Sequence, residues 1–213
     1  MTILEVPVRT FAPVLLSLAL FATIVLSAVG RTTPGADERK KVLVVISTTL
    51  GAIEVDLDPA RAPATVANFL RYVRGGFYDG GRFHRTVTLQ NQPGQPVKIQ
   101  VIQAGMNPAP EKEEFAPIPL ERTSVTGLRH TDGAISMARA EPDTATADFF
   151  ICIGDQPDLD FGGKRNPDGQ GFAAFGRVVR GMDVVRRIQR SPAAGQTLTP
   201  AVEILSIHLR GGA

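Results

Sequence analysis

Residues 42–57 read VLVVISTTLGAIEVDL, which is the pattern of two short β-strands joined by a turn. The first half is a run of β-branched and aliphatic residues, and Thr48-Thr49-Leu50-Gly51 is typical of a tight turn. From Ala52 onward, apolar residues alternate with acidic ones, as in a strand with one face in a core and the other in water. Pro59 and Pro63 end this strand. We therefore expect the folded domain to begin abruptly at residue 42 with two strands.

The rest of the chain alternates short strand patterns with two amphipathic helices. Pro63 stands where the first helix begins, and this helix ends at Gly75-Gly76; its apolar face consists of Val66, Phe69, Leu70 and Val73. The second helix is predicted over residues 182–190, with Met182, Val185 and Ile188 on one face. Further strands are predicted at residues 82–88, 97–103, 134–138, 149–153, 172–179 and 201–209. Many short strands with two helices favour a barrel or sandwich with helix-covered ends over a βαβ repeat.

Composition and charge exclude several classes of protein. The 213 residues are 43% hydrophobic and 21% charged, which suits one packed domain and excludes wholesale disorder. A formal net charge of +2 without a long basic run gives no indication of a nucleic-acid-binding surface. The lone Cys152 excludes an intramolecular disulfide, and the three histidines lack metal-ligand spacing, so we expect no metal and no cofactor. Ser136 shows no sequence sign of a histidine or aspartate partner.

The N-terminus is a separate segment. No charged residue occurs between Arg9 and Arg31, and residues 14–29 are almost entirely apolar. The segment is predicted to be a cleaved secretory signal or a retained membrane anchor: Ala28-Val29-Gly30 favours cleavage, whereas the weak basic region before it does not. Membrane contact is thus expected through residues 10–30, and the working domain is expected to be exported, periplasmic or anchored to the cytoplasmic membrane facing outward. The predicted organisation is a signal or anchor over 1–30, a linker over 31–41 and a domain over 42–210.

Six strings of sequence occur in a characteristic order. They are PATVANF at 63–69, GRFHR at 81–85, IQAG at 102–105, GAISMARA at 133–140, DFFI at 148–151 and FGRVVRGMDVV at 175–185. Together they resemble the cyclophilin family of peptidyl-prolyl cis-trans isomerases, and Met-Ala-Arg is similar to its bacterial branch. The resemblance implies a mainly β fold, a closed eight-stranded antiparallel barrel capped by two α-helices. It also implies a monomer without a cofactor that isomerises X–Pro bonds in proline-containing peptides and unfolded protein clients.

The resemblance further implies a catalytic site. Arg85 would donate a hydrogen bond to the prolyl nitrogen in the twisted transition state, and Gln103 would orient the guanidinium. Val101, Phe150, Leu159 and Phe172 would form an apolar socket for the proline ring. The full set expected to contact the peptide is Phe83, Val101, Ala138, Arg139, Ala140, Asp148, Phe150, Leu159 and Phe172.

Several departures from the family pattern leave room for a second function. The stretch 88–98, TLQNQPGQPVK, is longer than in the family and is expected to form an extended hairpin with Gln-Pro-Gly at its tip. It leaves the family's pocket phenylalanine unassigned, and Gln100 falls at that position. Asp148 stands where the family commonly has Gln, and we expect it to pair with Arg139. Asp158 replaces a tryptophan linked to cyclosporin sensitivity. The alternative is therefore a binding module or chaperone that holds proline peptides with little turnover.

Overall fold

The computed structural model describes residues 42–108 and 113–211. The predicted signal or anchor at 1–30 and the linker at 31–41 lie outside the described residues. Within the described part of the chain, no helix is long and apolar enough to cross a membrane.

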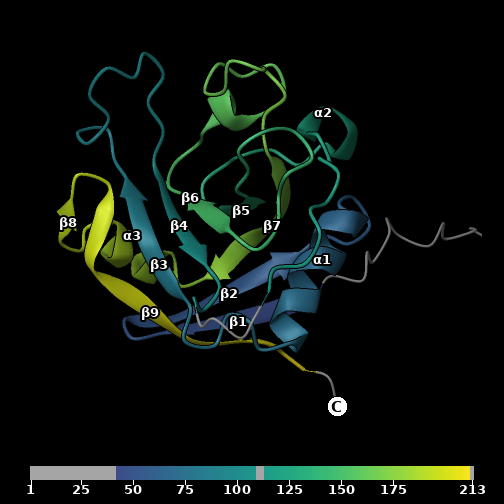
Figure 1. Ribbon diagram of the computed structural model, residues 1–213, viewed down its shortest axis with the longest axis vertical. Coiled ribbons are helices and arrows are strands. Elements are labelled where there is room, and N and C mark those ends of the chain that lie inside the picture. Colours follow the sequence, from purple (N-terminus) through teal and green to yellow (C-terminus); the bar gives the residue numbers. More distant parts are fainter. Residues whose placement is uncertain (1–41, 109–112, 212–213) are drawn as a thin grey trace, which may run out of the picture. The chain divides into compact units, whose positions relative to one another are not determined.

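The described residues contain nine strands in one antiparallel sheet (Figure 1). These are β1 Val42–Thr48, β2 Gly51–Leu57, β3 Arg82–Val87, β4 Val101–Gly105, β5 Ala134–Met137, β6 Phe149–Cys152, β7 Ala173–Arg180, β8 Ala193–Ala194 and β9 Thr197–Leu209. The order is β1-β2-β7-β5-β6-β4-β3-β9, and β1 also pairs with β9, which closes these strands into a barrel. The short β8 pairs with β9 as a side ribbon. The predicted eight-stranded antiparallel barrel is confirmed.

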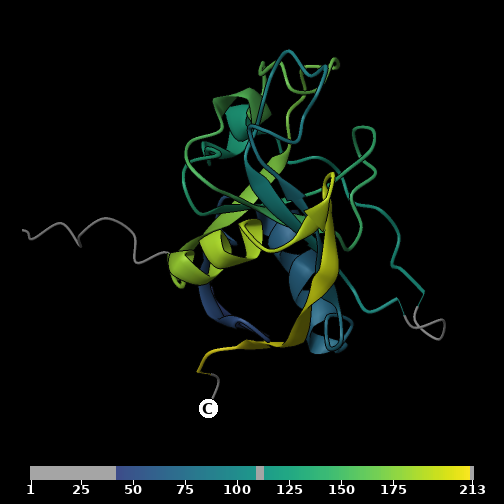
Figure 2. The same ribbon diagram turned by 90° about the vertical axis from the view of Figure 1, so that its left-hand side faces the viewer.

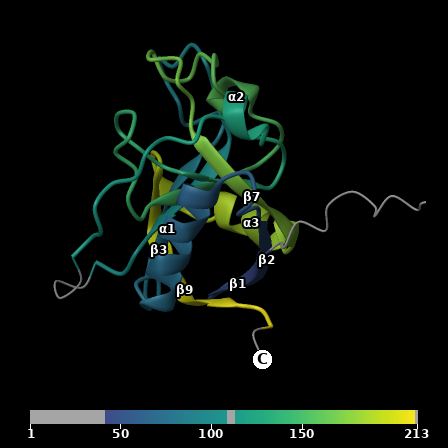
Figure 3. The same ribbon diagram turned by 90° about the vertical axis from the view of Figure 1, so that its right-hand side faces the viewer.

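Two helices cover the barrel on opposite sides, as the apolar spacing predicts (Figures 1, 2 and 3). They are α1, Pro63–Arg74, and α3, Met182–Gln189. Their buried side chains, such as Phe69 of α1 and Ile188 of α3, join the main core of the barrel. The short α2, Thr123–Thr126, was not predicted, because a single turn carries too few residues for an amphipathic pattern.

The N-terminus of α1 is stabilised by a residue from a distant loop. Ala62 precedes the helix and provides no side-chain cap. Instead Glu121 accepts hydrogen bonds from the backbone N–H groups of Ala64, at 3.1 Å, and Thr65, at 2.8 Å. A carboxylate is favourable at this end of a helix, where the backbone N–H groups lack helical partners. This contact holds the loop that follows β4 against the helix.

The predicted hairpin over 88–98 and the predicted strand over 97–103 are wrong in their extent. The tip is as expected, since Gln95 N donates to Gln92 O and Gly94 has φ +75°. However, residues 88–100 form a loop, and β4 begins only at Val101. The reason is the buried side chain of Gln92, which bonds Thr88 O and both the N–H and C=O of Ile99. The Gln92 side chain thus forms the hydrogen bonds to these backbone groups that a neighbouring strand would otherwise have formed.

Candidate functional site

A β-bulge at His84 separates the part of β3 that faces the core from the part that faces outward. Phe83 pairs with Ala104 and Arg85 pairs with Gln103, so His84 is an extra residue in the ladder. Phe83 lies inside the barrel, fully buried, with its ring edge-on to Phe149. The expectation that Phe83 contacts the peptide is therefore wrong.

Beyond the bulge, side chains of β3, β4 and β6 project from the outer face of the barrel. Val101 and Phe150 on these strands, together with Leu159 and the partly buried Phe172 from the connection between β6 and β7, belong to a second apolar cluster that is separate from the main core. A cavity of about 240 Å³ opens over this cluster. It is lined by Arg85, Ile99, Val101, Gln103, Ala138, Arg139, Phe150, Leu159, Arg165, Asn166 and Phe172. We call this cavity the groove. The structure thus brings most of the predicted site residues together, and it leaves Phe83, Ala140 and Asp148 outside the lining.

Arg85 is held in the groove by two glutamines. Its Nη1 donates to Gln103 Oε1 at 3.0 Å, while Nε and Nη2 both donate to Gln196 Oε1, at 2.9 and 2.6 Å. Burial lowers the pKa of Arg85, but an arginine stays charged at neutral pH. A guanidinium has five N–H donors, so two remain for a ligand. Gln196 follows Gly195 in the β8–β9 turn, and sequence reasoning missed it because a turn glutamine is an ordinary surface residue.

The expected pairing of Asp148 with Arg139 is wrong. Asp148 Oδ2 accepts a hydrogen bond from Gln103 Nε2 at 2.9 Å and lies 3.6 Å from His84 Nε2. Burial raises the pKa of the Asp148 carboxyl, and the bond from Gln103 partly opposes that rise. Arg139 instead pairs with Asp168, at 2.8 Å, and donates to the carbonyl of Gly171. The loop before β7 supplies both partners, so Arg139 is occupied on the other side of the groove.

Comparison with known proteins assigns this site to a family. Residues 43–209 match the sequence model of the family described as cyclophilin type peptidyl-prolyl cis-trans isomerase/CLD. The chain belongs to the cyclophilins. Peptidyl-prolyl cis-trans isomerase A of Dickeya dadantii is 38% identical over 148 residues, which cover 69% of this chain and 70% of that protein. Peptidyl-prolyl cis-trans isomerase B of Escherichia coli is 36% identical, covering 69% and 84% respectively.

The fold agrees with solved cyclophilin structures. The crystal structure of a cyclophilin type peptidyl-prolyl cis-trans isomerase from Cryptosporidium parvum superposes with a TM-score of 0.65 at 20% identity. The match covers 81% of this chain and 99% of that one. The protein is therefore a cyclophilin-type peptidyl-prolyl cis-trans isomerase by sequence family, with the barrel fold that this family shares.

A buried polar chain supports the floor of this cyclophilin's groove. His130 Nδ1 lies 2.7 Å from Asp160 Oδ1, and His130 Nε2 lies 3.0 Å from Ser136 Oγ. The imidazole stacks on Phe150 with ring centroids 5.9 Å apart. Ser136 thus has the partners that its sequence context did not indicate. Because Ser136 is fully buried, the three residues position the floor and cannot present a nucleophile to a substrate.

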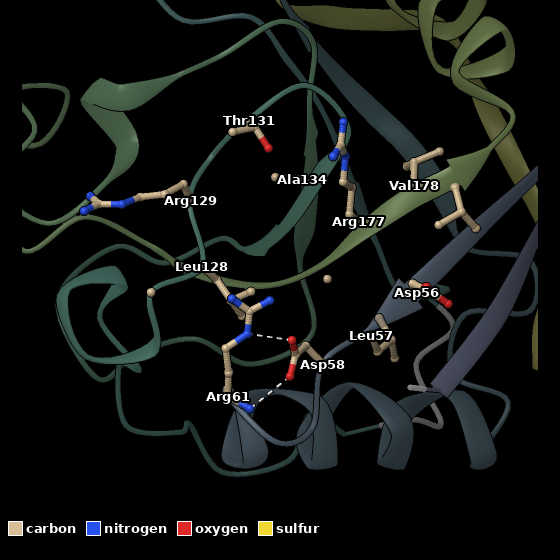
Figure 4. Close-up of a pocket in the computed structure, with 13 residues that line it drawn as sticks. Asp56, Leu57, Asp58, Arg61, Leu128, Arg129, Thr131, Ala134, Arg177 and Val178 are labelled. Carbon is tan, nitrogen blue, oxygen red and sulfur yellow. Dashed lines mark hydrogen bonds and ion pairs between the residues drawn. The ribbon is translucent and has the colours of Figure 1, made fainter. Parts of the chain in front are cut away.

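A larger cavity of about 620 Å³ lies elsewhere, between β2, β7 and the residues that precede β5 (Figure 4). Two acidic residues line it, Asp56 and Asp58, and Asp58 already accepts two hydrogen bonds from Arg61. The two arginines on its rim point away from each other: Arg129 lies near Asp160, and Arg177 donates to Asp132 O. The cavity therefore shows no convergent set of polar groups, whereas the groove does.

Proposed function

We propose that this cyclophilin accelerates X–Pro isomerisation in polypeptides and that Arg85 is its catalytic donor. The peptide bond resists rotation by about 18–20 kcal/mol because twisting destroys amide resonance. In the twisted state the prolyl nitrogen becomes pyramidal and basic. A hydrogen-bond donor that is fixed before the substrate arrives stabilises that state more than the planar one. The reaction needs no nucleophile, metal or cofactor.

One observation carries this proposal: the Arg85 guanidinium is fixed by Gln103 and Gln196 at the edge of an apolar floor. A proline ring seated on Phe150 and Phe172 would lie beside the two free N–H groups. A crystal structure of the related Cryptosporidium parvum protein was determined in the presence of the dipeptide Ala-Pro. That structure supports a proline-containing peptide as the ligand of the groove in this chain.

Isomerisation of an Ala-Ala-Pro-Phe peptide, followed by NMR exchange spectroscopy with the full-length protein, tests the assignment. We expect Arg85→Ala to lower kcat/KM at least about 100-fold, equivalent to roughly 2.7 kcal/mol. Arg177→Ala is the matched control, since Arg177 is exposed and lies outside the groove. Equal rates for wild type and Arg85→Ala would refute the role of Arg85. Peptide binding without turnover in the wild type would favour the binding module.

We further propose that the enzyme assists folding outside the cytoplasm. The support is the apolar segment at residues 10–30, which suits a secretory signal or an anchor. Fractionation of a bacterium that expresses the full chain tests this location. We expect the protein in the periplasm after loss of residues 1–30, or in the membrane fraction at full length. A full-length protein in the cytosolic fraction would contradict the proposal.

A further inference from the structure

The loop over residues 88–100 places a second guanidinium in the groove. Arg165 Nη1 donates to Gln92 Oε1 at 3.0 Å and to Val97 O at 2.7 Å. Arg165 itself comes from the loop before β7, and both loops rise on the same side of the barrel (Figures 1 and 2). Its side chain lines the groove together with Arg85, Phe150 and Leu159. The segment that departs from the family pattern is therefore part of the wall of the site.

Arg165 and Arg85 lack a carboxylate partner within residues 42–108 and 113–211. The third arginine of the groove, Arg139, is neutralised by Asp168. Asp148 is bound to Gln103 and lies near His84, not near an arginine. The described part of the groove thus carries two positive charges that no ion pair compensates.

Arg165 also retains donors for a ligand. Both of its hydrogen bonds start from Nη1, so its Nε and Nη2 groups have no acceptor among the described residues. The side chain is half-buried, and burial lowers its pKa, with the positive charge of Arg85 adding to the effect. Two like charges that influence each other in a partly desolvated groove both attract a ligand carboxylate.

We infer that this cyclophilin prefers substrates with an acidic side chain next to the proline, and that Arg165 is the residue that selects them. The inference rests on the proposed isomerase function of the same groove. A carboxylate from the peptide would accept hydrogen bonds from Nε and Nη2 of Arg165, a geometry that a planar guanidinium favours. The loop over residues 88–100 holds Arg165 ready for that contact.

Two pairs of peptides test the preference with the full-length protein at low ionic strength. They are Ala-Glu-Pro-Phe against Ala-Gln-Pro-Phe, and Ala-Pro-Glu-Phe against Ala-Pro-Gln-Phe. NMR exchange gives kcat/KM, and chemical-shift titration gives Kd whether or not turnover occurs. We expect the wild type to favour the Glu peptide at least about threefold in one pair, with the ratio falling as salt is added.

Arg165→Gln should reduce the Glu-to-Gln ratio to about one, and Arg165→Lys should keep part of it. Lys164→Gln is the matched control, because it removes a neighbouring exposed charge that does not line the groove. A wild type without a Glu preference, or a preference that survives in Arg165→Gln, would overturn the inference. If no peptide is isomerised, the proposed function fails. The Kd ratio then still decides whether Arg165 selects acidic peptides. Circular dichroism checks that each variant is folded.

Discussion

Gln103 donates from Nε2 to Asp148 Oδ2 at 2.9 Å, and its Oε1 accepts from Arg85 Nη1 at 3.0 Å. A carboxylate only accepts hydrogen bonds and a guanidinium only donates them. Only one orientation of the Gln103 amide can therefore bond to both Asp148 and Arg85. Asp148 therefore acts through Gln103 on Arg85, the proposed catalytic residue. It keeps the amide oxygen turned toward Arg85 without entering the groove.

Removing that acceptor is expected to loosen Arg85. We predict that Asp148→Leu lowers kcat/KM about tenfold, because Gln103 loses the partner that fixes its orientation. Asp148→Asn should change kcat/KM by less than about threefold, since its amide oxygen still accepts from Gln103 Nε2. NMR exchange on Ala-Ala-Pro-Phe measures both. Equal activity in Asp148→Leu and Asp148→Asn would show that Asp148 does not orient Gln103.

Gln196 is expected to position Arg85 from the opposite side. Gln196→Met has similar length but lacks the oxygen that accepts from Nε and Nη2. We predict a loss of about tenfold in kcat, roughly 1.4 kcal/mol, because Arg85 keeps its charge but loses the acceptor that fixes its orientation. The Kd for the peptide should stay within about twofold, because the apolar floor is intact. Gln95→Met, at an exposed position of the 88–100 loop, is the control and should leave kcat unchanged. A loss confined to Kd would assign Gln196 to binding.

The buried Asp160 carboxylate should make stability depend on pH. Burial by itself would raise its pKa, but hydrogen bonds and charge from His130 outweigh burial, and the net pKa is lowered. The Asp160 carboxylate therefore stabilises the fold fully at pH values above the pKa of an aspartate in the unfolded chain, about 3.9. That contribution is lost as the pH falls through the folded pKa.

We predict that Asp160→Ala lowers the free energy of unfolding by about 2–3 kcal/mol at pH 7, because it leaves the N–H groups of His130 without an acceptor. The difference from wild type should shrink as the pH drops below about 4. Urea denaturation at several pH values measures this. Asp183→Ala, on the exposed face of α3, should cost less than about 1 kcal/mol at every pH. A pH-independent difference for Asp160→Ala would contradict the prediction.

The contact of Glu121 with α1 should affect the free energy of unfolding but not the catalytic rate. Glu121→Ala removes the acceptor of two backbone N–H groups, and we expect a loss of about 1–2 kcal/mol in the free energy of unfolding. The value of kcat/KM at 10 °C should not change, since Glu121 does not line the groove. Glu203→Ala, on the exposed face of β9, is the control and should fall within about 0.5 kcal/mol of wild type. A lower kcat/KM in Glu121→Ala would link α1 to the groove.

Much of the fold could be predicted because it depends on local patterns. Alternation identified the strands, and apolar spacing identified α1 and α3. The errors occur where a distant contact overrides the local pattern. Residues 88–100 look like a hairpin, but Gln92 takes their backbone groups and keeps them as a loop. Phe83 and Arg85 have the spacing of one strand face, but the bulge at His84 sends them to opposite faces.

The sequence by itself determined most of the strands and the two helices, because local residue patterns encode them. Its resemblance to the cyclophilins also implied the closed barrel and the meeting of Arg85, Gln103 and Phe150 in one groove. Only the tertiary structure decided which side chains complete the site. Gln196 contacts Arg85, Asp148 contacts Gln103 and Arg165 lines the groove, and the three come from different connections, so no local pattern encodes their meeting. A hydrogen bond or an uncompensated charge depends on distances of a few ångströms between residues far apart in the chain. Those distances exist only after the barrel has closed.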